Sequence, residues 1–107
     1  MDAIINIKYT LKDNTSDVIR LFFDFSNDDI RGEFVLLALK LLRGGYTSLI
    51  EMSKIISKHS EGTIIINPIH INRIDTTCMF GYDTKITLDG LLKISGEVIE
   101  PDMVSGN

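Results

Sequence analysis

The fold is decided by a stretch near the start of the chain, INIKYTLKDNTSDVIRLFFDF (residues 5–25), in which apolar and polar side chains alternate. Side chains of a β-strand point alternately to its two faces, so this pattern is typical of strands with one buried face. The alternation covers residues 5–11 and 19–25, and a short segment rich in Asp, Asn and Ser separates the two runs. We therefore predict an antiparallel hairpin. Its buried face would hold Ile5, Ile7, Tyr9, Leu11, Ile19, Leu21, Phe23 and Phe25.

Two helices are predicted after the hairpin. Residues 26–29, Ser-Asn-Asp-Asp, supply capping side chains and negative charge for a helix start, and apolar residues then recur at spacings of three and four. Gly44-Gly45 ends this helix, because glycine readily takes the left-handed backbone of a C-cap. A second helix begins near Ser48, which has the spacing of a capping box with Glu51, and ends at residues 60–62. The short connection predicts a helical hairpin that lies on one face of the sheet.

The pattern of strands returns in the last third of the chain. Residues 63–74 alternate in part and are interrupted by Pro68, which cannot donate a hydrogen bond to a neighbouring strand. Residues 77–82 form another predicted short strand. Asp89-Gly90 lies between two apolar runs, residues 85–88 and 91–99, and therefore predicts a second hairpin.

The order of these elements predicts an α+β fold. It has a mostly antiparallel sheet, built from the N-terminal hairpin plus three or four C-terminal strands, with a two-helix hairpin packed on one face. A chain of 107 residues suits one domain, predicted over residues 1–101, with residues 102–107 as a frayed C-terminal tail. The hydrophobic fraction of 44% is enough for a core without disulfides or a structural metal.

Composition argues against several functional classes. The single cysteine, Cys78, allows no internal disulfide, and the N-terminus lacks a basic and apolar leader, so a cytoplasmic location is expected. The longest apolar run, residues 34–42, is far shorter than the roughly 20 residues that a membrane-spanning helix needs, so no membrane partner is expected. The net charge of −4 argues against direct binding of nucleic acid.

Few side chains suit catalysis or metal binding. Cys78, His70 and Asp75 have the chemistry of a nucleophile, a base and an orienting carboxylate, but Cys78 lies among apolar neighbours and is explained more simply as a small buried side chain. A zinc site from His59, His70 and Cys78 would have suitable ligands but lacks their usual close spacing. We predict no catalytic residue, no metal and no cofactor, and an enzymatic role stays open.

An apolar patch is predicted on the outer face of the sheet. Phe22 lies on the polar face of its strand, Val18 lies on the same side, and Ile4 points away from the buried face of the first strand. Such a patch marks an interface, unless the sheet curls and buries both of its faces. His70 and Asn72 share a polar strand face that suits recognition. The predicted partner-binding residues are Ile4, Val18, Arg20, Phe22, His70 and Asn72.

The sequence thus predicts a small non-enzymatic protein-binding module, an inhibitor, adaptor or self-associating regulatory protein. It would act through the exposed sheet face on another protein or on itself as a homo-oligomer. The alternative is a homo-oligomeric protein that binds a small anionic or nucleotide-like ligand, or a small enzyme, with a site near Arg43–Ser48 and His70–Cys78. Two glycines before a helix start can offer backbone amides to an anion, although a C-cap followed by an N-cap explains the same residues. The ligand-binding residues of this alternative are Arg43, Gly44, Gly45, Tyr46, Thr47 and Ser48.

Overall fold

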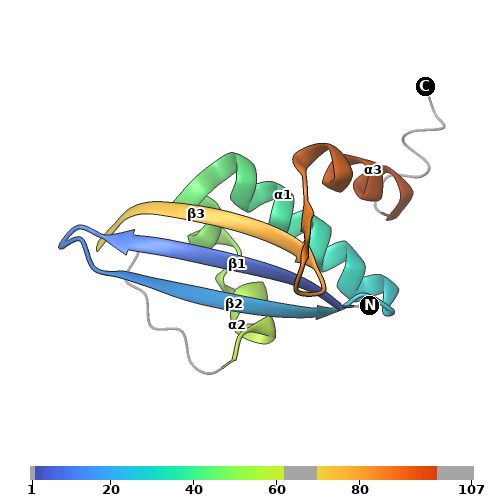
Figure 1. The fold of residues 1–107 in the computed structure, drawn as a ribbon, viewed down its shortest axis with the longest axis horizontal. Coiled ribbons are helices and arrows are strands. Elements are labelled where there is room, and N and C mark those ends of the chain that lie inside the picture. The colour runs from blue at the N-terminus through green and yellow to red at the C-terminus, as the bar shows by residue number, and fades with distance from the viewer. Residues whose placement is uncertain (1, 62–69, 99–107) are drawn as a thin grey trace.

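A four-stranded antiparallel sheet is covered by helices on one face in the computed structural model, which describes residues 2–61 and 70–98 (Figure 1). The strands lie in the order β2-β1-β3-β4, and every neighbouring pair is antiparallel. The predicted α+β class, the antiparallel sheet and the helical cover on one face are confirmed. In chain order the elements are β1 (Asp2–Leu11), β2 (Ser16–Asp24), α1 (Asp28–Glu51), α2 (Ser53–His59), β3 (Ile71–Phe80), β4 (Thr84–Ile86) and α3 (Leu88–Val98).

The N-terminal hairpin is confirmed. Strands β1 and β2 pair from Asp2↔Asp24 to Thr10↔Ser16. In the turn, the Asp13 carboxylate accepts hydrogen bonds from the amide and hydroxyl of Thr15, at 3.0 and 2.6 Å. Asn14 has a φ of 69°, a left-handed conformation that asparagine tolerates better than most residues. The Asp/Asn-rich segment therefore makes the turn for the reason that its composition indicated.

The core lies between the sheet and α1. The inward face of the hairpin packs into the core as predicted, although Tyr9, Leu11 and Phe25 are only half-buried. The rings of Phe23 and Phe34 meet edge to face with centroids 5.4 Å apart. Phe25 joins this cluster and contacts the rings of Phe34 and Phe80. Aromatic edge-to-face pairs add directional contacts to the burial of apolar area. The fully buried side chains of α1 are Phe34, Val35, Leu37 and Ala38.

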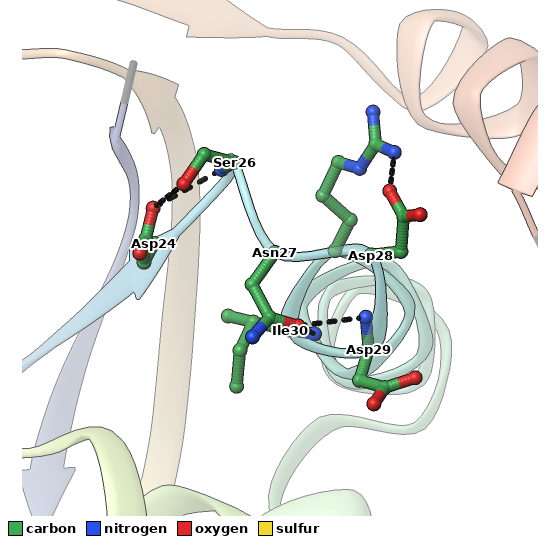
Figure 2. A network of polar contacts seen from close by, with 7 residues as sticks. Asp24, Ser26, Asn27, Asp28, Asp29 and Ile30 are labelled. Atoms are coloured by element: carbon green, nitrogen blue, oxygen red, sulfur yellow. Dashed lines mark hydrogen bonds and ion pairs between the residues drawn. The ribbon is translucent and has the colours of Figure 1, made fainter.

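The start of α1 is capped as the sequence predicted (Figure 2). Asn27 is the N-cap, and its side-chain oxygen accepts hydrogen bonds from the amides of Asp29 and Ile30, at 2.9 and 3.2 Å. One turn earlier, the Asp24 carboxylate accepts bonds from the amide and hydroxyl of Ser26. These bonds connect the end of β2 directly to the first turn of α1.

The helical cover bends at the predicted glycines. Gly45 has φ 56° and ψ −138° within α1, so the helix is kinked there. The predicted capping box of Ser48 and Glu51 is wrong: the Ser48 hydroxyl donates to the Lys40 carbonyl at 2.7 Å, and Glu51 forms an ion pair with the Lys40 ammonium. Both side chains therefore bind back across the kink instead of capping a new helix.

The helical hairpin itself is confirmed. The chain leaves helical geometry again at Met52, and α2 then runs back along α1. At the end of α2, the Lys58 ammonium and the His59 ring lie 2.9 and 2.6 Å from the Glu33 carboxylate, near the start of α1. The ring of His59 also stacks on Phe23, with centroids 4.2 Å apart. His59 therefore joins α2 to both α1 and the sheet.

The C-terminal third differs from the prediction. Strand β3 is one continuous strand of ten residues, where two separate strands were expected. The hairpin predicted at Asp89-Gly90 is wrong, because these residues begin α3. The Thr87 hydroxyl accepts a hydrogen bond from the Gly90 amide at 3.1 Å, and the Thr87 carbonyl accepts one from the Leu91 amide. Residues 70–98 therefore hold two strands and a helix instead of a run of strands.

Part of the prediction lies outside the described residues. This holds for the strand expected over 63–66, for the interruption at Pro68 and for the tail over 102–107. The domain bounds of 1–101 stay a prediction.

Candidate functional site

The sheet has one face that carries no helix within residues 2–61 and 70–98, and we call it the open face (Figure 1). Alternation along each strand decides which side chains belong to it, because neighbours of buried, helix-facing residues point the other way. The open face comprises Asp2, Ile4, Asn6, Lys8 and Thr10 of β1, Ser16, Val18, Arg20, Phe22 and Asp24 of β2, Arg73, Asp75, Thr77 and Met79 of β3, and Lys85 of β4.

Three apolar side chains lie side by side across this face. Ile4 pairs with Phe22 on β2 and with Met79 on β3, so the three form one row perpendicular to the strands. We call this set the apolar row. Ile4 is only 3% exposed although no described helix covers it, whereas Phe22 and Met79 are half-buried. Ile4 is therefore covered within the row, and Phe22 and Met79 supply the accessible apolar area.

The predicted patch is only partly contiguous. Ile4 and Phe22 are neighbours as expected, but Val18 pairs with Lys8, four residues from Phe22 along β2. That separation is about 13 Å in an extended strand. Val18 is 48% exposed and lies apart from the apolar row. Met79 was missed, although the burial expected for Cys78 implied that the next residue would point outward.

Polar contacts hold the flank of the apolar row. The Arg20 Nε donates to the Asn6 side-chain oxygen at 3.2 Å, and the Asn6 amide nitrogen lies 3.9 Å from the Met79 sulfur. These contacts connect β2, β1 and β3 on the open face. Among residues 2–61 and 70–98, Arg20 has a hydrogen-bond partner only for Nε, and its terminal guanidinium nitrogens have none. Arg20 is thus confirmed as a residue of this face beside Phe22.

Charges of opposite sign flank Phe22 on β2, with Asp24 on one side of the apolar row and Arg20 on the other. Asp75 of β3 lies beside Lys8, and Lys85 of β4 is in line with the row. Asp2 and Asp24 pair with each other at one end of the strands, and Arg20 and Lys8 lie on the opposite side of the row. Hydrogen bonds from the side chain and then the backbone of Ser26 hold the pKa of Asp24 below its usual value, so this carboxylate is ionised at neutral pH (Figure 2). Among the described residues, neither Arg20 nor Lys8 forms an ion pair.

His70 and Asn72 do not join this group. The pairing of β3 with β1 shifts by one residue between Thr10 and Leu11. Thr10 pairs with Arg73 and Leu11 pairs with Ile71, so Asn72 is the extra residue of a β-bulge. The expected alternation is therefore wrong: Ile71 faces the core, and Arg73 lies on the open face. Met79 lies seven residues beyond Asn72, about 23 Å in an extended strand.

The alternative site near the kink in α1 is only partly exposed. Arg43, Gly44, Tyr46 and Thr47 are exposed, whereas Ser48 is buried and its hydroxyl is bound to the Lys40 carbonyl. A Cβ atom on Gly44 would clash with the Ser48 hydroxyl, so glycine permits this close approach. The geometry of the kink therefore explains Gly44, Gly45 and Ser48. The binding of a small anion here stays a prediction.

The reactive side chains lie far apart or are buried. Cys78 faces the core, and burial raises the pKa of its thiol to about 12, so little nucleophilic thiolate forms at neutral pH. His70 lies just before β3, at the end of this strand that is far from Cys78. His59 is held between Phe23 and Glu33. In the part of the chain that the structure describes, no three His, Cys, Asp or Glu residues are grouped to hold a metal ion.

None of the helices in the described ranges combines the length and apolar character needed to cross a membrane. Comparisons of the chain with models of protein families, with curated proteins and with solved structures find no match.

Proposed function

We propose that this protein is a non-enzymatic protein-binding module that acts through the open face of its sheet. The observation that carries the proposal is the apolar row of Phe22, Ile4 and Met79 on a face without a described helix. The solvated face of an antiparallel sheet normally carries polar side chains. A row of three apolar residues there is more typical of an interface than of a solvent-facing surface.

The composition of the face supports binding of a protein. Aromatic residues, methionine and arginine are enriched at protein interfaces. Here Phe22 and Arg20 are neighbours on β2, and Met79 lies on the other side of Ile4, on β3. Methionine adapts its shape to a partner, and a partly buried aromatic ring supplies a large apolar area. The surrounding Asn6 and Thr77 provide a polar rim, which is the usual surrounding of an apolar interface centre.

The proposal includes the biological setting expected from the sequence. An inhibitor, an adaptor and a self-associating regulatory protein all bind without chemistry of their own. A cytoplasmic location is supported by the use of a single cysteine, which lies buried as a free thiol.

Photo-crosslinking from two positions tests the proposal. One variant carries a photo-reactive phenylalanine derivative in place of Thr77, which lies on the open face opposite Asn6. The matched control carries it in place of Tyr46, which is 49% exposed in the helical layer. After irradiation in cells that express the protein, we expect a discrete protein adduct from position 77 and little from position 46.

The role of the apolar row is tested in the same experiment. Adding Phe22→Asp to the position 77 variant should remove the adduct, because a carboxylate in the row opposes burial of the face. Adducts from position 46 alone, or none from position 77, would overturn the proposal.

A further inference from the structure

We infer that the partner of the open face is a second copy of this chain, in a face-to-face dimer whose two-fold axis lies along the apolar row. This inference rests on the proposed function and names its partner. In a two-fold dimer the same surface is used by both copies, so the surface must be complementary to itself. The order of charges on the open face meets this requirement.

The decisive residues lie on β2. Asp24, Phe22 and Arg20 occupy successive open-face positions, so an acid and a base flank the aromatic ring at equal distances of about 7 Å along the strand. Rotation about an axis along the apolar row reverses the strand direction and leaves each strand above its own copy. Phe22 then lies over Phe22, and Asp24 of each copy lies over Arg20 of the other. The symmetry produces this ion pair twice.

Within the part of the chain that the structure describes, both partners of the ion pair have unused bonding capacity. The two hydrogen bonds from Ser26 end on Oδ1 of Asp24, at 3.1 and 2.6 Å, and leave Oδ2 for another donor. Arg20 uses only Nε for its bond to Asn6, so its two terminal nitrogens remain for a carboxylate. Arginine and carboxylate groups form strong charge-assisted hydrogen bonds in this geometry.

The other two-fold arrangement is less favourable. An axis parallel to β1 would place Asp2 of one copy over Asp2 of the other, and would leave Arg20 over the uncharged Thr77. Like charges facing each other across an interface disfavour that arrangement. The axis along the apolar row in turn places the two copies of Lys85 over each other, at the edge strand β4. Of the two arrangements, it is the one that forms the two Asp24–Arg20 ion pairs, and these pairs select it.

The size of the overlap predicts a weak dimer. The axis brings the apolar row and one further row on each side into contact. Three rows about 7 Å apart, on three strands about 4.8 Å apart, cover roughly 300 Å² on each copy, to which β4 adds only Lys85. The total of roughly 600 Å² lies at the low end of the range of transient complexes. Each copy also has its own core of buried side chains, so the monomer does not need the partner to fold.

Charge reversal on β2 tests the dimer. The mass of the full-length protein is followed by analytical ultracentrifugation from about 10 μM to about 1 mM, a range that covers weak association. The wild type should rise from 12.0 kDa toward twice that mass. Arg20→Glu and Asp24→Lys should each weaken association about tenfold, because each places like charges face to face. An equimolar mixture of the two variants, and the double variant, should restore it, because each again pairs an acid with a base.

Val18→Ser is the matched control, since Val18 is an exposed apolar residue of the same face that lies outside the overlap. It should leave association unchanged. Because Asp24→Lys also removes the bonds to Ser26, the interface is also mapped on the wild type by NMR, which needs no substitution. Concentration-dependent amide shifts of the wild type should be confined to residues of the apolar row and its two flanking rows.

The outcomes separate this inference from the proposed function. A wild type that stays at 12.0 kDa, shifts confined to α1 or α3, or folded charge variants that fail to complement each other would overturn the dimer. If the crosslinker at position 77 then captures a different protein, the binding role of the face stands without the dimer. If position 77 yields no adduct, both fall.

Discussion

At the scale of single residues, Glu33 connects the two helices that cover the sheet. Its carboxylate lies 2.9 Å from the Lys58 ammonium and 2.6 Å from His59 Nε2, and these two contacts are the largest causes that hold its pKa below the usual value. A carboxyl whose pKa is lower in the folded state contributes stability above its unfolded pKa. That stability is lost as pH falls through the folded pKa.

We therefore expect Glu33→Gln to destabilise the protein at pH 7 and to have little effect in strong acid. The loss at pH 7 should be about 1–2 kcal/mol, because the carboxylate is partly exposed and its pairs are partly screened. Urea unfolding of the wild type and the variant, at pH 7 and at about pH 2, measures this difference. Lys58→Met, which removes only the more exposed partner, should cost less. An equal loss at both pH values would contradict the role of the ionised carboxylate.

At the scale of elements, two of the three glycines of α1, Gly32 and Gly45, have opposite roles. A Cβ atom would meet no atom within 4 Å at either position, so space does not distinguish them. Gly45 has a φ of 56°, which side chains with a Cβ atom rarely adopt, whereas Gly32 has no such conformation. We expect Gly45→Ala to cost about 1–3 kcal/mol through backbone strain. Gly32→Ala should stabilise the helix by about 0.5–1 kcal/mol. Thermal unfolding of both variants tests the pair, and a stabilising Gly45→Ala would show that the kink is not required.

Local signals predicted some elements better than others. The hairpin, the Asn27 cap and the glycine break were predictable because each depends on neighbours within a few residues. Asp89-Gly90 misled the prediction because the same dipeptide suits a hairpin turn and the first turn of a helix. The arrangement Thr87, Leu88, Leu91 and Leu92 contains the helical signal, a cap followed by apolar residues at spacings of three and four.

At the scale of the whole molecule, the candidate site was predictable only in part. Ile4, Phe22 and Arg20 could be placed on the open face from alternation alone. Met79 joined them only when the strand order was known, because β3 pairs with β1 across a long stretch of sequence. The positions of His70 and Asn72 depended on a bulge, which alternation does not reveal.

A comparison of Phe22 with its neighbour Phe23 on β2 tests whether the open face is accessible to a partner in the folded protein. Phe23 is 1% exposed and packs against Phe34 and His59, so Phe23→Ala should cost about 3–5 kcal/mol and leave a marginal fold. Phe22 is half-buried on the face without a described helix, so Phe22→Ala should cost only about 1 kcal/mol. Urea unfolding of dilute protein, in which no partner is bound, measures the free energy of unfolding of the two alanine variants. Similar costs would mean that the sheet curls and buries Phe22 as core, and the face would then be unavailable for binding. A small loss of stability for Phe22→Ala would mean that the fold does not depend on this ring. The ring would then be accessible to a partner, as both the binding role and the dimer require.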